Sequence, residues 1–120
     1  MEIVQIALQV ILGLIFLAAG LTKVVASKAA LQPKMTWVES FPAAAVKGIG
    51  AAETLGALAL LLPLVSALPE SLALISAACL AVTMVLAIVV HVRLKETSQS
   101  LPAAILLLLL VALIALRLTQ

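Results

Sequence analysis

The sequence predicts an all-α integral membrane four-helix bundle that forms a single domain over residues 1–120, and three observations predict it. Of the 120 residues, 66% are hydrophobic, whereas soluble domains have about 45–50% apolar residues. Only 10% are charged, where about 25% is usual. Four apolar segments, at about residues 3–25, 42–65, 71–92 and 101–118, each have about the 20 residues needed to cross a bilayer. A soluble domain of this size could not bury so much apolar surface.

The later spans each begin near a proline. Pro42, Pro69 and Pro102 stand where the second, third and fourth spans start, and proline is tolerated there because its missing N–H would have no helical partner. Pro63 lies near the end of the second span and is expected to end or bend that helix. The fourth span, apolar from Ala103 to Leu116, is expected to contribute only an apolar wall to the bundle.

The connection between the first two spans is long enough to hold a short helix. At about residues 28–41, Leu31, Met35 and Val38 recur at helical spacing between charged residues. Trp37 suits the depth of the membrane interface. We therefore expect an interfacial segment that lies in the plane of the membrane surface.

Basic residues are distributed unevenly between the two sides of the predicted bundle. Six of the seven Lys and Arg lie near the first and third connections: Lys23, Lys28, Lys34, Lys47, Arg93 and Lys95. The opposite side holds only Arg117. Because Lys and Arg favour the cytoplasmic side, we expect the first and third connections to be cytoplasmic and both termini to lie outside.

Three ionisable residues lie inside the predicted spans and toward one side of the membrane. Glu53 stands near the middle of the second span, where an acid costs about 2.5–3.5 kcal/mol on insertion scales. Lys23 lies near the end of the first span and His91 near the end of the third. We expect these three side chains to converge on one polar, ligand-binding cavity between the first three helices.

Neighbouring residues extend this candidate cluster, and simpler roles stay open. Thr22, Met84 and Arg93 are secondary candidates beside the three ionisable residues. Glu53 could instead lock helix packing by pairing with Lys23 or with the Thr22 hydroxyl. Lys23 could be an ordinary lysine whose amine reaches the interface, and His91 could be interfacial without a chemical role.

Small residues on the second span predict close helix packing around Glu53. These are Gly48, Gly50, Ala52 and Gly56. Small side chains at helical spacing let the backbones of membrane helices approach each other. In the first span, Gln5 and Gln9 lie four residues apart, and we expect them to bond to each other or to a neighbouring helix.

Several classes of site are excluded by composition. The chain has no Asp, and its Glu residues and single His are too scattered for a metal site on one element. Cys79 is the only cysteine, which excludes an internal disulfide and a CxxC pair. A haem site is not predicted, because His91 has no second ligand. With only three aromatic residues, nucleic acid is not an expected partner.

The sequence resembles the DoxX-like family of small four-helix bacterial membrane proteins. The resemblance lies in residues 20–23 (GLTK), 50–57 (GAAETLGA) and 60–63 (LLLP), and in Met84 and Ala87 leading to His91 and Arg93. It implies a protein of the bacterial cytoplasmic membrane, in which Lys23, Glu53 and His91 match the Lys, Glu and His of the family motif. Some members are associated with quinone-linked redox complexes and others with oxidative-stress assemblies. The family implies no common reaction.

Three functions are compatible with these residues. The first is a membrane subunit that binds a quinone or lipid and serves a redox or stress-response complex, since a buried acid, amine and imidazole could bind a quinol oxygen and relay a proton. The second is an assembly factor or chaperone that recognises other membrane helices. The third is an enzyme acting on an apolar epoxide or isoprenoid. Expected partners are the lipid bilayer and other membrane proteins or a homo-oligomer.

Overall fold

The computed structural model of the chain describes residues 2–26, 42–95 and 97–119. Four helices make up almost all of this part: α1 (Glu2–Val25), α3 (Ala43–Val65), α4 (Ser71–Arg93) and α5 (Thr97–Leu118). No strand occurs in the described ranges, so the predicted all-α four-helix architecture is confirmed. The interfacial segment predicted at residues 28–41 lies outside the described residues.

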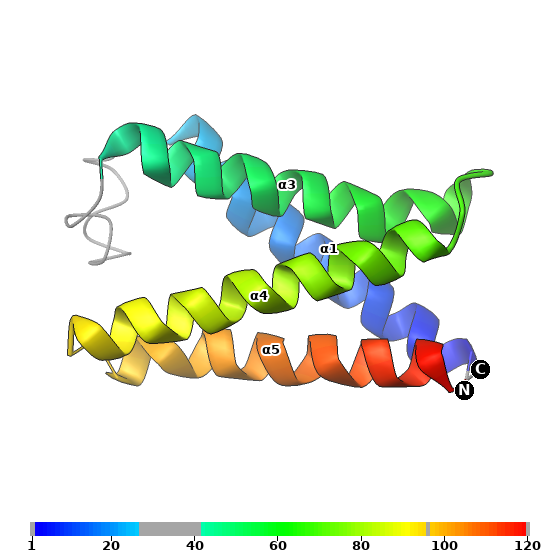
Figure 1. Cartoon of the computed structure of the whole chain (residues 1–120). Coiled ribbons are helices and arrows are strands. Elements are labelled where there is room, and N and C mark those ends of the chain that lie inside the picture. The colour runs from blue at the N-terminus through cyan, green and yellow to red at the C-terminus, as the bar shows by residue number, and fades with distance from the viewer. Residues whose placement is uncertain (1, 27–41, 96, 120) are drawn as a thin grey trace.

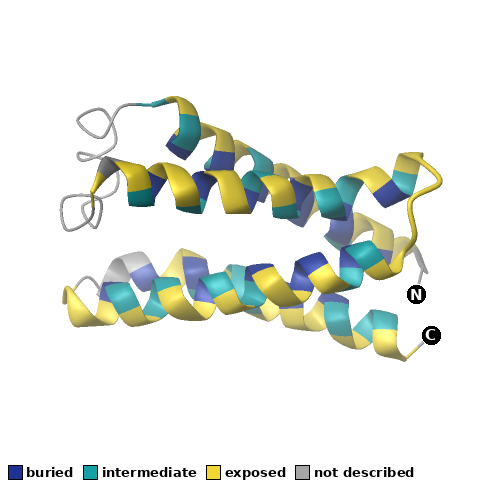
Figure 2. Ribbon diagram, turned by 45° about the horizontal axis from the view of Figure 1, so that its top comes forward, coloured by how far each residue is buried: buried dark blue, intermediate teal, exposed yellow. Residues whose placement is uncertain are grey.

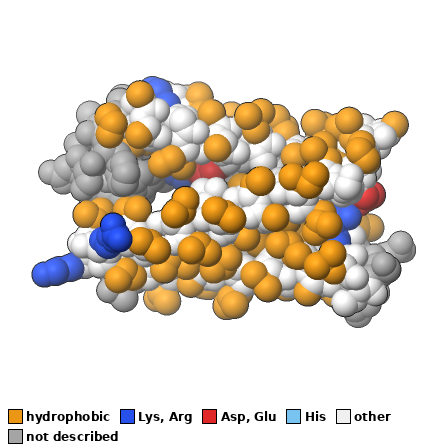
Figure 3. Space-filling model, in the orientation of Figure 1, with side chains coloured by type: hydrophobic (Ala, Val, Ile, Leu, Met, Phe, Trp, Pro, Cys, Tyr) orange, Lys and Arg blue, Asp and Glu red, His pale blue; other side chains and the backbone are white. Residues whose placement is uncertain are grey.

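All four helices are long and apolar enough to span a membrane. The candidate spans are Ile3–Val25, Ala44–Val65, Ser71–Arg93 and Ser100–Leu118. Their outward faces are apolar, and in Figure 3 hydrophobic side chains cover most of the visible face. Leu55 is 68% exposed and Leu108 is 69% exposed. Such faces are stable only against lipid, so the chain is a multi-pass membrane protein.

The helices form two closely packed pairs that together make a four-membered ring. α1 packs mainly on α3, and α4 packs mainly on α5, while contacts of α3 with α4 and of α1 with α5 complete the ring. Both chain termini lie at one end of the bundle, which we call the terminal end (Figure 1). α1 and α4 finish at the opposite end, called the distal end, where α3 and α5 begin.

A narrow apolar core runs along the inner faces of the helices. Leu12, Phe16, Leu60, Leu110 and Leu113 are fully buried, and Figure 2 shows the buried residues facing the interior on each helix. The core is thin because lipid, rather than protein, covers the outer surface. Packing between helices must therefore supply most of the attraction that holds the bundle together.

Pro63 and Pro102 lie near helix ends, and the position of Pro102 within its helix differs from the prediction. Pro63 lies inside α3, which ends two residues later at Val65, in line with its predicted effect. Pro102 also lies inside a helix, because α5 begins at Thr97, earlier than the predicted start of the fourth span. A proline at this position removes the N–H that would bond to the carbonyl of Ser98, a loss confined to the beginning of α5.

One close contact joins α3 to α4 in the terminal half of the bundle. A Cβ atom added at Gly56 would lie 2.9 Å from the Leu80 side chain, so the absence of a side chain admits Leu80. The Ser76 hydroxyl donates a hydrogen bond of 2.6 Å to the Gly56 carbonyl. A hydroxyl bonded across helices inside a bilayer adds to the packing of the pair.

Candidate functional site

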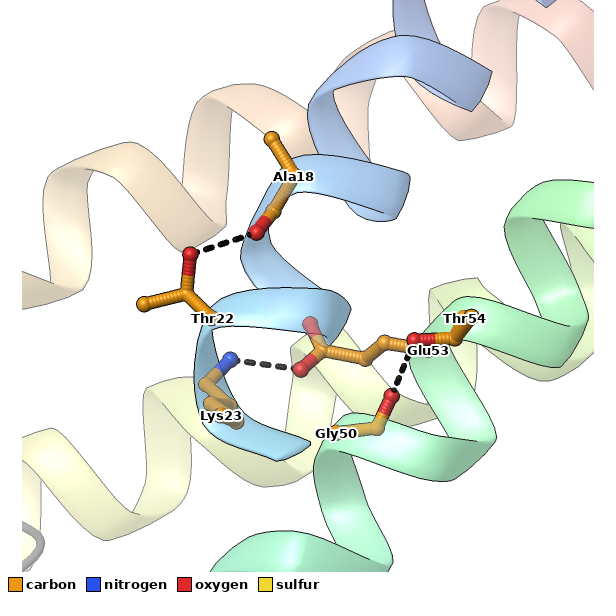
Figure 4. Close-up of polar contacts among 6 residues, drawn as sticks. All are labelled: Ala18, Thr22, Lys23, Gly50, Glu53 and Thr54. Carbon is orange, nitrogen blue, oxygen red and sulfur yellow. Dashed lines mark hydrogen bonds and ion pairs between the residues drawn. The ribbon is translucent and has the colours of Figure 1, made fainter. Parts of the chain in front are cut away.

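A buried ion pair joins α1 to α3. Lys23 Nζ lies 2.5 Å from Glu53 Oε1, and the two side chains are 11% and 3% exposed. Figure 4 shows the side chains pointing toward each other from the two helices, with the second carboxylate oxygen turned away from Lys23. Of the alternatives that the sequence leaves open for Glu53, the partner is therefore Lys23 and not the Thr22 hydroxyl.

The antiparallel arrangement of α1 and α3 brings these residues together. Lys23 lies in the last turn of α1, whereas Glu53 lies near the middle of α3. Side chains in a helix lean toward its N-terminus, so Lys23 leans into the bundle and Glu53 leans toward the distal end. The two side chains thus span the distance along the bundle axis that separates the backbones of Lys23 and Glu53.

Two glycines allow the helices to come close at this level. A Cβ atom on Gly20 would lie 2.7 Å from the Gly50 carbonyl oxygen, and one on Gly50 would lie 2.7 Å from the Gly20 carbonyl oxygen. A Cβ on Gly50 would also meet the Lys23 Cβ. The backbone contact therefore sets the short distance across which the ion pair forms.

Hydroxyl groups near the ion pair bond within their own helices. The Thr54 hydroxyl donates to the Gly50 carbonyl at 2.8 Å. Thr22 is exposed, and its hydroxyl donates to the Ala18 carbonyl at 2.7 Å. Figure 4 shows Thr22 pointing away from Glu53. The structure thus does not bring Thr22 into the cluster, because consecutive residues on a helix point about 100° apart.

His91 lies at the same end of the bundle as Lys23. It is in the last turn of α4 and is 9% exposed. Its convergence with Lys23 and Glu53 stays a prediction. Of the secondary candidates on α4, Met84 is 6% exposed and belongs to the apolar core, whereas Arg93 is exposed at the end of the helix.

The small residues of α3 divide between two faces. Gly50 packs against α1 and Gly56 against α4. Gly48 and Ala52 are exposed, and a Cβ on Gly48 would meet no atom within 4 Å among the described residues. Helix packing at Gly50 and Gly56 is thus seen within the chain, whereas Gly48 and Ala52 do not pack against another described helix, and packing at these two positions stays a prediction. At about 100° per residue, Gly48 lies almost opposite the buried face that carries Glu53.

Lys47 binds the end of α1. Its Nζ donates to the Val24 carbonyl at 2.6 Å and to the Ala26 carbonyl at 3.4 Å. The last carbonyls of a helix have no partners in the helix itself, and a cation there also meets the negative end of the helix dipole. Lys47 is thus a tertiary cap that ties the start of α3 to the end of α1.

A second polar group, which the sequence does not predict, lies toward the terminal end. Arg117 Nη2 donates to Gln9 Oε1 at 2.5 Å and to Glu70 Oε2 at 2.6 Å. Gln9 Nε2 donates to the Leu60 carbonyl at 2.6 Å. Gln9 is therefore satisfied by neighbouring helices, one of the two arrangements expected for it. The fourth helix contributes Arg117 as well as an apolar wall.

The available signal for this group was the polar spacing in α1. Gln5 and Gln9 lie on one face of an apolar helix, and Arg117 is at the same end of the predicted bundle. The sequence could not predict that Gln9 and Arg117 bind each other, because this depends on which helix neighbours α1. The described residues contain no group of three or more His, Cys, Asp or Glu that could hold a metal ion.

Comparison with known proteins gives one match. Residues 7–113 match the family model described as the DoxX-like family. This region includes the Lys23–Glu53 ion pair and the glycine contacts described above, and ends before Arg117. No curated protein and no solved structure matches the chain.

Proposed function

The chain belongs to the DoxX-like family, and we propose that it binds the polar head of a lipophilic molecule, such as a quinone or a lipid, at the Lys23–Glu53 ion pair. The observation that carries this proposal is the burial of both charges between two apolar helices, with side chains 11% and 3% exposed. Ionisable groups at such depth are costly to insert and commonly serve ligand or proton pathways.

The distal half of the bundle offers a way for such a molecule to arrive from the lipid. The helix pairs α1–α3 and α4–α5 diverge toward this end (Figures 1 and 2). Figure 3 shows a hollow between α3 and α4 in the same region, with an acidic side chain at its edge. A ligand entering here would pass His91 in the last turn of α4.

The chemistry of the pair suits the oxygen atoms of a quinone or quinol. The Lys23 ammonium donates to Glu53 Oε1, and a quinone carbonyl is a comparable acceptor for an ammonium N–H. The Glu53 carboxylate can in turn accept a hydrogen bond from a quinol hydroxyl. His91 would exchange the proton with the distal side. Electrons would pass from the quinol to a partner subunit of a redox or stress-response complex, or from that subunit to the quinone.

Ligand binding is tested by native mass spectrometry of the detergent-solubilised protein with a short-chain ubiquinone. We expect the wild-type protein to retain the quinone and both Glu53→Gln and Lys23→Gln to lose at least about tenfold in affinity, as for loss of a charge-assisted hydrogen bond. Leu108→Ala, on the lipid-facing side of α5, is the matched control. Full binding in Glu53→Gln together with loss in Glu53→Leu would leave the acid only a structural role.

A second candidate function is that of an assembly factor or chaperone for other membrane proteins. The observation that favours it is the exposure of Gly48 and Ala52 on the outer face of α3, since small residues let another helix approach closely. This function predicts a co-purified membrane protein that is lost in Gly48→Leu, with no bound small molecule. The same mass spectra distinguish the two functions.

We further propose that the protein lies in a bacterial cytoplasmic membrane with the distal end facing the cytoplasm. The support is the position of Arg93 and Lys95 at this end. At the opposite end, Arg117 is the only basic residue among those described, and it binds Glu70. Lys95→Cys in a Cys79→Ala background should react with a membrane-impermeant maleimide in inverted vesicles only. Labelling in intact cells would reverse the orientation.

A further inference from the structure

The polar residues at the terminal end form a separate, built site. This terminal cluster consists of Gln9, Glu70 and Arg117, which are joined by hydrogen bonds, and of Gln5, which lies one helical turn from Gln9. Gln9 is fully buried, Gln5 is 8% exposed, and the Arg117 side chain is 8% exposed. Glu70, which precedes α4, has a side chain that is 60% exposed. Among the described residues, the buried guanidinium thus has one carboxylate partner, and that partner lies at the surface.

The guanidinium of Arg117 is incompletely bound. Its Nη2 donates to Gln9 Oε1 and to Glu70 Oε2, while its Nε is buried with no hydrogen-bond partner in the described part of the chain. Arginine binds carboxylate and phosphate groups best through two parallel N–H bonds. Glu70 supplies an acceptor to one donor of this fork and leaves the other donor unused.

Gln5 carries a second unsatisfied group in the same cluster. Its Oε1 is buried and has no hydrogen-bond partner among the described residues. Gln5 lies one helical turn from Gln9, on the same face of α1. Because a side-chain amide can turn over, Gln5 can present either its oxygen or its NH2 group to a ligand. An anion placed beside Arg117 would thus find a further donor there.

We propose that Arg117 binds the phosphate group of an anionic bilayer lipid, and that Glu70 occupies this position when no lipid is bound. Arg117 is the second-last residue of α5, a helix that spans the membrane, so its guanidinium lies near the level of lipid headgroups. The exposed Glu70 carboxylate can be displaced, whereas the buried Gln9 holds the guanidinium in place. A phosphate has enough oxygens to fill both Nη2 and Nε.

Because Glu70 competes with the lipid phosphate in this proposal, a substitution of Glu70 should strengthen lipid binding. Native mass spectra would compare retention of phosphatidylglycerol and of phosphatidylcholine with matched chains. We expect wild-type protein to prefer phosphatidylglycerol, and Glu70→Gln to raise its affinity about tenfold by removing the competing carboxylate. Arg117→Gln should remove the preference. Arg117→Lys, which keeps the charge but not the fork, should weaken it several-fold.

The control is Lys95→Gln, which removes an exposed positive charge at the distal end and should leave the lipid preference unchanged. Thermal unfolding of each variant in detergent reports whether it is folded. Glu70→Gln tests the site while Arg117 itself stays unchanged. Unchanged or weaker phosphatidylglycerol retention in Glu70→Gln would overturn the proposal and leave the cluster as a clamp between helices. Displacement of the lipid by inorganic phosphate at millimolar concentration would also overturn it, assigning the site to a free anion.

Discussion

Gly20 and Gly50 contact each other reciprocally across the α1–α3 interface. A Cβ atom on either glycine would lie 2.7 Å from the carbonyl oxygen of the other, a distance that real Cβ atoms essentially never show. The Lys23–Glu53 ion pair forms three residues further along each helix. The geometry of the candidate site therefore depends on two positions that have no functional group.

Gly20→Ala and Gly50→Ala should each destabilise the protein, because the added methyl group meets backbone atoms that cannot rotate away. We expect a loss of about 1–3 kcal/mol in the free energy of unfolding, as for overpacked cores. Unfolding by SDS titration measures it. Gly48→Ala is the control, since the space there is open, and it should be neutral or stabilising by up to about 1 kcal/mol. Equal effects at Gly48 and Gly50 would contradict the assigned packing face.

The ion pair should show strong coupling in a double-mutant cycle. Lys23→Met or Glu53→Gln alone breaks the buried ion pair by removing one of its two charges, which costs about 3–5 kcal/mol for buried pairs. The combined Lys23→Met and Glu53→Gln variant should recover much of that loss, because no uncompensated charge remains. Free energies of unfolding in detergent give the coupling energy. Additive losses would show that the two side chains do not depend on each other.

Gly56→Leu should weaken the α3–α4 contact by colliding with Leu80, whose side chain lies 2.9 Å from a Cβ built at Gly56. The expected loss is about 1–3 kcal/mol in the free energy of unfolding. Gly56→Ala should be milder, since the contacting atoms belong to a flexible side chain. Adding Leu80→Ala to Gly56→Leu should restore part of the stability. If Leu80→Ala restored no stability, the loss in Gly56→Leu would not come from a collision with Leu80.

Lys95→Gly should stabilise the end of α4. Lys95 has φ of 60°, and its N–H bonds to the Val92 carbonyl at 3.1 Å. A left-handed conformation costs a residue with a Cβ atom about 1–2 kcal/mol, and glycine avoids this cost. We expect a gain of about 1 kcal/mol, measured by thermal unfolding. Lys95→Ala removes the charge but keeps the Cβ, so it should give no comparable gain.

The sequence alone determined the architecture of this protein, because the bilayer imposes a simple rule. A backbone in hydrocarbon must satisfy its own hydrogen bonds, so four long apolar segments can only be helices. Alternation of the spans then places Lys23, His91 and the start of α3 at one end. For the same reason, Glu53 could be recognised as exceptional from its position in an apolar span, before its partner was known.

Tertiary structure alone decided which residues meet, since that depends on helix rotation and on which helices are neighbours. Gly48 and Gly50 are two residues apart and chemically identical, yet one faces outward and the other contacts Gly20. By sequence, Arg117 is an ordinary basic residue at a helix end, and the packing of α5 beside α1 is what brings it to Gln9. In a bundle whose outer face is covered by lipid, apolar periodicity is weak, because both faces of each helix are apolar. Contacts at glycines and polar groups, rather than a hydrophobic stripe, therefore set the rotation of each helix.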